Sequence, residues 1–275
     1  MIHVFKHHAM ATEFQVRLAT DDAGYAAQAA HAAFLETDRL ENYLSRFRPN
    51  SDIAALAELR PGEMLRVTEP AFACLTLARE MEAATGGAFS PTAAARRTQA
   101  GPPRWSLLPG KFSIRCDIGR LEFDLGAIGK GFALDRMAEI LREWSCPDFL
   151  LIAGYSSILA GGPPPGTPGW SVGLGTAHTE PRFALTHGSM SGSGIAVQGR
   201  HILDPRTGAP AAQRNSTWAL APTAAVSDAL STACMVLAEP EIEKIMADRN
   251  DWLVWLPAGS GWRHFGGRAL PARTT

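Results

Sequence analysis

The N-terminal part of the chain opens on alternating apolar and polar positions. Residues 4–18 alternate in this way, which predicts a β-strand or a β-hairpin. Asp21 and Asp22 follow, and both are residue types that commonly cap the start of a helix. An alanine-rich run with helical spacing continues from them to about Phe47. We therefore expect a hairpin followed by one long helix.

Helical spacing returns over residues 69–84. Pro70 stands in the first turn of this segment and Gly86 lies just past its end, which is the usual placement of these two residues around a helix. Residues 99–116 are rich in proline and glycine and show no regular period. We expect them to form an irregular, exposed excursion.

The C-terminal half mixes short apolar runs with helical patterns. Strands are predicted at residues 148–153, 170–174, 183–186 and 252–255, helices at 224–237 and 239–249, and a loop at 161–169. The sequence contains no internal repeat and no linker long enough to separate independent domains. We therefore expect a single α+β domain over residues 1–275.

A glycine-rich motif, DLGAIGKGFALD, occupies residues 124–135. A strand that ends in such a turn and opens a helix presents free backbone N–H groups and the positive end of a helix dipole, which suits a phosphate. Gly131 follows Lys130 where a Walker loop needs Ser or Thr, and the spacing is not GxGxxG either. By itself such a motif is more often a glycine-rich connection without function.

Asp228 and Thr232 lie four residues apart in a predicted helix and therefore share one face. A carboxylate and a hydroxyl so placed can offer two oxygen ligands to Mg²⁺. On an exposed helix the pair would have no special role. The surrounding residues are apolar almost all round, however, which predicts a buried helix. A buried Asp is costly unless a metal ion or a hydrogen-bond donor compensates it.

Composition narrows the range of functions. Of the 275 residues, 46% are hydrophobic and 19% are charged, which is ordinary for a globular protein with a sizeable core. The net charge is -1 and no long basic run is present, so we expect no nucleic-acid partner. The four cysteines show no metal-ligand spacing, and we expect reduced structural thiols. They are Cys74, Cys116, Cys146 and Cys234.

The hydropathy of the chain also bears on its location. No stretch approaches the roughly 20 apolar residues that a membrane span needs, so no membrane span is expected. The N-terminal residues contain no uninterrupted apolar segment of the kind that signal peptides carry. We expect a cytoplasmic protein.

Three further motifs occur in the order and rough spacing of one known family. They are SRFRPNSDI at residues 45–53, TGGAFSPT at residues 85–92 and HILDPRTGAP at residues 201–210. Together with DLGAIGKG they show that the chain resembles the ApbE family of FAD:protein FMN transferases, from Met10 to about Trp255. The resemblance implies a compact T-fold-like body with a flavin-binding cleft.

The resemblance implies an activity as well. Members transfer FMN from FAD to a Thr or Ser of a target flavoprotein, form a phosphoester and release AMP, and they use Mg²⁺. The matching Asp and Thr of the family coordinate the metal, which implies Asp228 and Thr232 here, with the backbone carbonyl of Ala127 as a third ligand. Asp124 and Lys130 would contact FAD, and Lys130 would neutralise charge on its pyrophosphate.

Other residues take roles from the resemblance alone. His201 would lie at the active site, where it could act as general base toward the attacking hydroxyl. A lone histidine outside such a motif is more often a structural hydrogen-bonding residue. Met10, Ala88, Phe89 and Ser90 would line the flavin pocket, the last three through their backbone and the Phe89 ring. Within HILDPRTG, the residues Asp204, Pro205 and Gly208 are expected to shape a turn and Arg206 to pair structurally.

The chain departs from the family pattern at several points. Ala11 replaces a glycine, Ala57 an asparagine and Ser90 an aspartate, a GGD segment becomes GYS at residues 154–156, and TSGDY becomes MSGSG at residues 190–194. These changes alter the expected flavin and acceptor surface more than the metal and pyrophosphate motifs. Two alternatives therefore stay open: an Mg²⁺-dependent FAD pyrophosphatase that gives FMN and AMP, and a non-catalytic FAD-binding protein.

Overall fold

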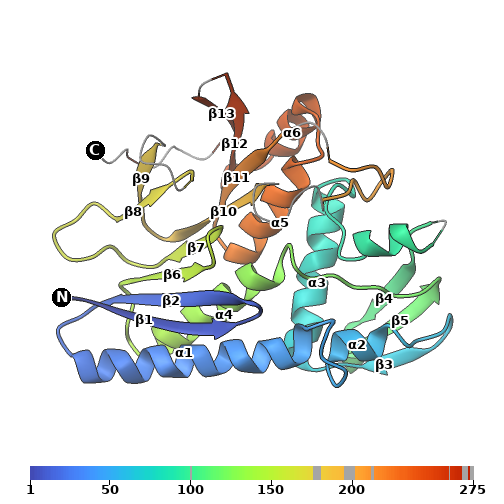
Figure 1. Ribbon diagram of the computed structural model, residues 1–275, viewed down its shortest axis with the longest axis horizontal. Coiled ribbons are helices and arrows are strands. Elements are labelled where there is room, and N and C mark those ends of the chain that lie inside the picture. Colours follow the sequence, from blue (N-terminus) through green and yellow to red (C-terminus); the bar gives the residue numbers. More distant parts are fainter. Residues whose placement is uncertain are drawn as a thin grey trace.

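An eight-stranded antiparallel sheet forms the frame of the protein (Figure 1). The computed structural model describes residues 1–99, 101–175, 181–194, 202–211, 214–259, 261–267 and 272. In spatial order the strands are β1 (Ile2–Ala9), β2 (Thr12–Ala19), β6 (Phe149–Ala153), β7 (Ser157–Ala160), β10 (Gly188–Gly194), β11 (Ser216–Ala221), β12 (Leu253–Ala258) and β13 (Gly261–Phe265). Among the described residues no pairing joins β1 to β13, so the sheet is open.

Two smaller sheets lie at opposite ends of the molecule in Figure 1. One has the order β3 (Met64–Arg66), β5 (Ser113–Ile118), β4 (Arg104–Leu108), and the other pairs β8 (Trp170–Gly173) with β9 (Arg182–Leu185). The prediction of an irregular excursion over residues 99–116 is therefore wrong. Trp105 and Ile114 are buried in this region, and the Trp105 ring packs edge-on against Phe123, so contacts with the core order a segment whose composition suggests a loop.

The helices begin and end close to the expected positions. Their bounds are α1 (Ala23–Leu44), α2 (Asp52–Leu56), α3 (Glu69–Ala84), α4 (Gly129–Glu143), α5 (Ala224–Cys234) and α6 (Glu239–Met246), with 3₁₀ turns at Ala93–Arg97 and Pro109–Lys111. The α3 prediction is confirmed over its whole length. Asp22 caps α1 by accepting the Tyr25 N–H at 2.9 Å. The α1, α5 and α6 predictions each run three residues too far.

The two faces of the main sheet are covered differently. α5 packs on β10 and β11, α4 packs on α5, and α1 packs on α4 and on β1, so helices cover one face. Strand β11 shows the division, since Ala219 and Ala221 join the main core whereas Trp218 and Leu220 join a second cluster beneath β8 and β9. The main core draws residues from the hairpin at one end of the chain to β13 at the other, which agrees with the expected α+β class.

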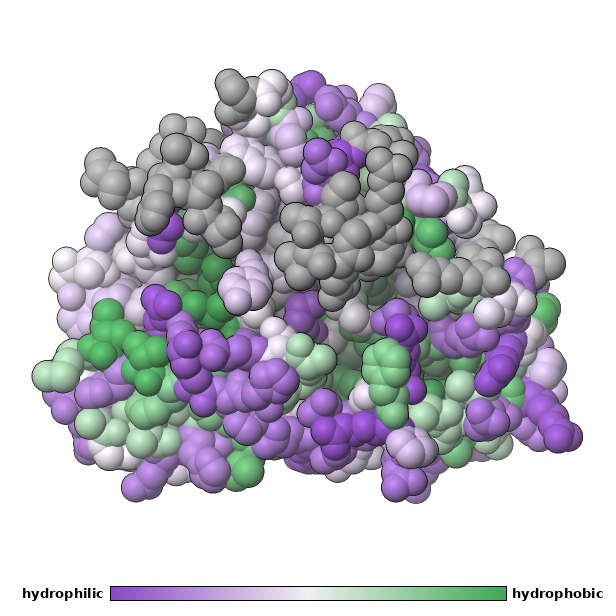
Figure 2. Space-filling view, viewed as in Figure 1, coloured by the Kyte–Doolittle hydropathy of each residue, from purple (hydrophilic) through white to green (hydrophobic). Residues whose placement is uncertain are grey.

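The surface of the protein is mixed in character. Figure 2 shows hydrophilic side chains gathered along the lower part of the face, where α1 and the β1–β2 hairpin lie, with apolar patches between them. None of the described helices combines the length and the hydrophobicity that crossing a bilayer requires.

Candidate functional site

Helices α4 and α5 cap each other through two aspartates. The N–H of Gly131, in the first turn of α4, donates to Asp228 Oδ2 of α5 at 2.8 Å. In return, Asp135 of α4 accepts the N–H groups of Ala224 and Ala225, the first two residues of α5, at 2.7 Å and 2.9 Å. We call these five residues the reciprocal cap. It joins the two segments that sequence analysis singled out for phosphate and metal binding.

Close approach of the two helices depends on a glycine. A Cβ atom on Gly131 would lie 2.1 Å from the carbonyl oxygen of Ala224 and 2.6 Å from the backbone nitrogen of Ala225. Both are backbone atoms, which cannot move aside as the end of a side chain can. Gly131 is therefore needed here for space, and the glycine-rich motif has a packing function in addition to any role toward phosphate.

Asp228 is buried, with 5% of its surface exposed, and is held by neutral donors. The Ser157 hydroxyl donates to Oδ1 at 2.6 Å, and Gly131 donates to Oδ2. Within the described part of the chain, no Lys or Arg forms an ion pair with this carboxylate. The buried donors expected from the sequence are present, yet the negative charge has no cationic partner there, and the carboxylate retains lone pairs for further ligands.

A row of hydroxyl groups joins α5 to strand β10. Ser189 and Ser191 both contact the Ser227 hydroxyl at 2.8 Å, and one pleat further along Ser193 contacts Thr232 at 3.0 Å. The three β10 serines share one face of the strand because side chains alternate along it. Thr232 is partly exposed, so its hydroxyl lies at the edge of the buried row, one helical turn beyond Asp228.

The loop before α4 is folded onto itself. Asp124 Oδ1 accepts the Gly126 N–H at 2.9 Å, and Oδ2 forms an exposed ion pair with Arg46 at 3.1 Å. Lys130 Nζ donates to the Gly126 carbonyl at 3.1 Å. No strand leads directly into this loop, since β5 ends at Ile118, which corrects the expected strand–turn–helix arrangement. Asp124 does shape the turn, and its pairing with Arg46 brings the SRFRP segment beside it.

The oxygen groups gathered here fit the chemistry of Mg²⁺. Asp228 supplies a buried carboxylate without a cationic partner among the described residues, Thr232 supplies a hydroxyl, and Ala127 carries a backbone carbonyl in the loop that leads into α4. Mg²⁺ in proteins commonly takes one or two carboxylates and completes its shell with phosphate oxygens and water. The described residues contain no group of three or more His, Cys, Asp or Glu side chains arranged for a metal. A site here would therefore rely on neutral oxygens around one carboxylate.

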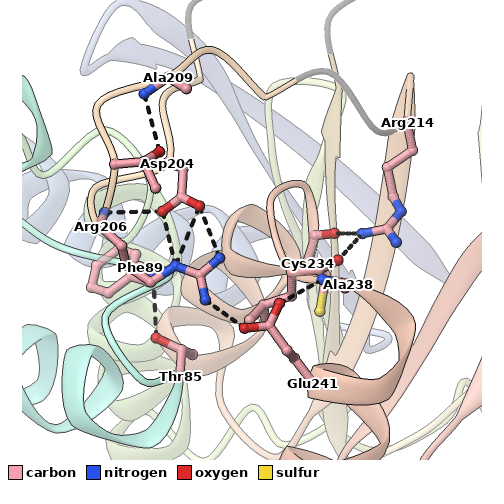
Figure 3. A network of polar contacts seen from close by, with 11 residues as sticks. Thr85, Phe89, Asp204, Arg206, Ala209, Arg214, Cys234, Ala238 and Glu241 are labelled. Atoms are coloured by element: carbon pink, nitrogen blue, oxygen red, sulfur yellow. Dashed lines mark hydrogen bonds and ion pairs between the residues drawn. The ribbon is translucent and has the colours of Figure 1, made fainter.

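The DPRTG turn is anchored to α6 by an arginine (Figure 3). Asp204 accepts the Arg206 N–H at 2.9 Å and binds its guanidinium through both carboxylate oxygens, and Arg206 Nη1 reaches Glu241 at 2.6 Å. The hydrogen bond that the Arg206 guanidinium donates to Asp204 is the main cause that raises the pKa of Arg206. Gly208 completes the turn with a φ of 77°. The expectation that these residues shape and anchor a turn is confirmed, whereas His201 lies outside the described residues.

Comparison with known proteins gives the family. The sequence model of the ApbE family matches residues 10–254. The chain belongs to the ApbE family. Curated relatives include a Haemophilus influenzae protein, 30% identical over 148 residues, and an Escherichia coli K12 protein, 27% identical over 162 residues, both named FAD:protein FMN transferase. The matched segments cover 48% and 54% of this chain, and they span only 42% and 46% of the length of these relatives.

Solved ApbE structures share the fold over almost the whole chain. The ApbE protein of Thermotoga maritima superposes with a TM-score of 0.81 at 22% identity and covers 96% of this chain and 97% of its own. The Pseudomonas stutzeri flavinyl transferase ApbE, in its apo form, gives a TM-score of 0.82 at 18% identity, with 96% and 93% covered. At these identities the likeness establishes the fold alone.

Four residues that the ApbE resemblance assigns to the flavin pocket differ in their exposure to solvent. Met10 lies in the β1–β2 turn and not in a strand, with a φ of 50°. Ala88 and Phe89 are each 2% exposed, and the Phe89 N–H is fixed by the Thr85 hydroxyl at 3.1 Å. The Phe89 ring therefore packs in the core, while Ser90 and Met10 are partly exposed. Roles for these four residues in flavin binding stay predictions.

A cavity lies beside the DPRTG turn, where Arg206 contributes to its lining. Its volume is about 480 Å³, and it is formed by the end of α3, α6 and Arg206. It contains none of the residues that we assign to FAD or Mg²⁺. Its charged lining residues are of both signs: Arg206, Glu241, Lys244, Asp248 and Arg249. Such a lining favours neither an anionic nor a cationic ligand.

Sequence reasoning missed several residues that build this ApbE site. Ser157, Asp135 and Ser193 received no role, although Asp135 closes the glycine-rich motif and Ser193 belongs to the altered MSGSG segment. The available signal was the helical spacing of Gly131 and Asp135, which places them on one face of α4. Their partners are 97 and 89 residues away in sequence, so only the fold reveals the contacts.

The titration of Asp135 should make the stability of this protein depend on pH. Partial burial raises the pKa of Asp135 to about 7, against the lowering effect of the two backbone hydrogen bonds, and nearby Asp228 and Glu139 raise it further. Between the unfolded value of about 3.9 and about 7, the folded state binds more protons than the unfolded chain. This contribution to stability is thus present at low pH and is lost as the pH rises through about 7.

The variant Asp135→Asn cannot titrate and should lack this contribution. Relative to the wild type, the free energy of unfolding of this variant should increase as the pH rises from about 3.9 to about 7. The increase should be at most about 1.4 kcal/mol per pH unit. Urea denaturation of both proteins across the interval measures the difference. A difference that stays constant with pH would show that Asp135 keeps an ordinary pKa in the fold.

Proposed function

We propose that this protein is an Mg²⁺-dependent FAD:protein FMN transferase that attaches FMN through a phosphoester to a Thr or Ser of a target flavoprotein. Membership of the ApbE family supports this proposal. The structural observation that carries it is the buried Asp228 carboxylate. This carboxylate has no cationic partner among the described residues and accepts a hydrogen bond from the first turn of α4. That turn directly follows the glycine-rich loop and carries Lys130, so a cation and a pyrophosphate would meet there.

The proposed reaction is a displacement at phosphorus. The hydroxyl oxygen of the acceptor attacks the FMN-side phosphorus of FAD, and the bond from that phosphorus to the bridging oxygen breaks. AMP leaves with the bridging oxygen, and the hydroxyl proton passes to a base. We assign the base to His201 on the strength of the family motif alone. Bound Mg²⁺ would withdraw charge from the phosphoryl oxygens and orient the pyrophosphate.

The protein's own residues divide the remaining work. Asp228, Thr232 and the Ala127 carbonyl would hold Mg²⁺, and Lys130 would exchange its contact with the Gly126 carbonyl for one with a phosphate oxygen. Asp124 would orient FAD from the same loop, while Met10, Ser90 and the backbone of Ala88 and Phe89 would line the flavin side. Substitution of Lys130 and of Asp228 tests two of these assignments.

One assay separates the proposal from its alternatives. The purified protein is incubated with FAD and MgCl₂, with and without an acceptor domain that exposes a Thr or Ser among small residues, and AMP and FMN are measured. Flavin fluorescence that stays with the denatured acceptor, in equal amount to AMP, supports transfer. Equal amounts of FMN and AMP without covalent flavin would establish a pyrophosphatase. FAD binding without AMP would establish a non-catalytic binding protein.

The proposed function also includes a protein acceptor and a cytoplasmic compartment. Co-expression with a flavinylation segment in the cytoplasm tests both the protein acceptor and the cytoplasmic location expected from the sequence. A fluorescent acceptor band in denaturing gels is the expected result. If free FMN accumulates instead and no protein becomes labelled, the reshaped surface at Ala57 and Ser90 would be admitting water in place of the acceptor hydroxyl.

Lys130→Ala should weaken FAD binding far more than riboflavin binding. A charge-assisted contact with phosphate contributes roughly 1.5–3 kcal/mol, so the dissociation constant for FAD should rise roughly 10- to 150-fold. Riboflavin has no phosphate and should be unaffected. Flavin fluorescence titrations measure both affinities, and Lys111→Ala, a change at a lysine in the 3₁₀ turn before β5, serves as the control. An equal loss for both ligands would exclude Lys130 from the pyrophosphate.

A further inference from the structure

Neither α4 nor α5 is capped by the side chain of the residue at its own N-cap position. The residues that precede α4 and α5 are Ile128 and Thr223, and neither side chain makes a capping hydrogen bond. The first N–H groups of a helix need partners, and a local Ser, Thr, Asp or Asn usually supplies them. Here each helix obtains its cap from an aspartate of the other, Asp228 for α4 and Asp135 for α5.

This exchange links Asp135 to the metal-binding residues that we propose. Asp135 accepts from both Ala224 and Ala225 and so fixes the position of the first turn of α5. Asp228 lies one turn further along the same short helix of 11 residues, and Thr232 one turn beyond it. A displacement of the first turn would therefore carry both oxygen ligands with it, since helical backbone moves as a unit over so few residues.

We propose that Asp135 is a positioning residue that sets Asp228 and Thr232 for Mg²⁺. The inference rests on the proposed function, because it concerns how well a cation is held. In this role Asp135 does not itself contact the cation. It acts by locking the start of α5 against α4, where the Gly131–Ala224 contact leaves no free space. Ligand sets lose affinity when their supporting hydrogen bonds are removed, commonly 10- to 100-fold.

The rival explanation is that Asp135 merely stabilises the fold, as any helix cap does. A stabilising cap would lower the melting temperature on removal but leave the Mg²⁺ requirement of the folded protein unchanged. A positioning residue would raise that requirement even at temperatures where the variant is fully folded. The two explanations therefore differ in a Mg²⁺ titration and not in stability.

The experiment compares Asp135→Ala and Asp135→Asn with the wild type. The alanine removes both acceptors, whereas the asparagine keeps one oxygen for Ala224 or Ala225. Tyr25→Phe is the matched control, since it removes a hydrogen bond from Tyr25 to the Trp144 carbonyl at the other end of α4. Two quantities are measured for each protein: the Mg²⁺ concentration for half-maximal AMP release from FAD, and the rise in melting temperature that MgCl₂ causes in the presence of FAD.

We expect Asp135→Ala to raise the half-maximal Mg²⁺ concentration about 10-fold or more and to abolish most of the Mg²⁺-induced rise in melting temperature. Asp135→Asn should show a smaller increase, and Tyr25→Phe should match the wild type in both measurements. If Asp135→Ala does not fold, the asparagine variant decides, because its Mg²⁺ requirement must exceed that of the wild type.

Two results would overturn the inference, and they are distinguishable. Unchanged Mg²⁺ requirements in the Asp135 variants, with a Mg²⁺-dependent wild type, would reduce Asp135 to a stabilising cap and leave the proposed function intact. A wild type that releases AMP without any divalent cation would remove the metal from the proposed function itself, and the positioning role with it.

Discussion

Replacing Asp228 with asparagine should abolish Mg²⁺-dependent release of AMP from FAD and leave the protein folded. The asparagine side chain has the same shape as aspartate but no charge. Its oxygen can accept the Gly131 N–H, and its amide can donate to the Ser157 hydroxyl, so the two contacts that Asp228 makes are preserved in number. The metal would lose its one carboxylate ligand among the residues assigned to it. We expect at least a roughly 100-fold lower rate.

The alanine variant is a less informative change at this position. Asp228→Ala would leave the Ser157 hydroxyl and the Gly131 N–H buried without an acceptor, and each such group costs about 1–3 kcal/mol. It should therefore lose stability as well as activity. Comparing the two variants by denaturant unfolding and by AMP release separates the structural role of Asp228 from its role toward the cation.

The control for loss of charge is Glu143→Gln, at an exposed carboxylate near the end of α4. It should behave as the wild type in both assays. If Asp228→Asn releases AMP at the wild-type rate and with the same Mg²⁺ requirement, Asp228 is not a metal ligand. The neutral hydrogen bonds would then be its entire function.

The sequence was sufficient where the signals are local. Helix α3 was placed over its full length because Pro70 marks its first turn and Gly86 its end, and Asp22 caps α1 as its residue type suggests. The β1–β2 hairpin follows from alternation alone. In the candidate site, a spacing of four residues placed Asp228 and Thr232 on one face of a buried helix. These features depend on residues within one or two turns of each other.

The sequence was insufficient where contacts between distant segments order the chain. Strand β10 reads GSMSGSG, a composition typical of a loop, and no strand was predicted there. It is a central strand because it pairs with β7 and β11, and because its serines bond to hydroxyls of α5. Likewise, β4 and β5 form around Trp105 and Ile114, which are buried by parts of the core that their own segment does not contain.

The difference between local signals and contacts of distant segments also explains why the sequence does not reveal the packing role of Gly131 and Asp135. The motif that contains Gly131 and Asp135 predicts a phosphate-binding turn, in which the glycines would serve the turn. In the structure, Gly131 is the point of closest approach to a helix almost one hundred residues away. A spacing rule cannot reveal such a contact, because the partner helix has its own separate pattern.

Gly131→Ala should destabilise the protein and remove its activity together. The added methyl group would lie 2.1 Å from the Ala224 carbonyl oxygen and 2.3 Å from its carbon, so α4 and α5 must separate. Separation weakens the hydrogen bonds of the reciprocal cap, in which Asp135 and Asp228 each hold the opposite helix. Forcing extra volume into a packed contact costs about 1–3 kcal/mol, and lost hydrogen bonds add to this.

Gly129→Ala is the matched control because it makes the same chemical change one half-turn earlier in α4. A Cβ atom there would meet only Leu125 Cβ at 3.6 Å, which is an ordinary van der Waals distance. Since alanine favours helix over glycine by about 1 kcal/mol, this variant should be as stable as the wild type or slightly more stable. The difference between the two variants isolates the steric contact from the change in helix propensity.

Urea unfolding and Mg²⁺-dependent AMP release are measured on both variants and on the wild type. We expect a lower unfolding midpoint and loss of AMP release for Gly131→Ala alone. Equal stability of the two variants would show that α5 can move away from α4 at little cost. In that case the reciprocal cap could not fix Asp228, and the close approach at Gly131 would have no bearing on the metal site.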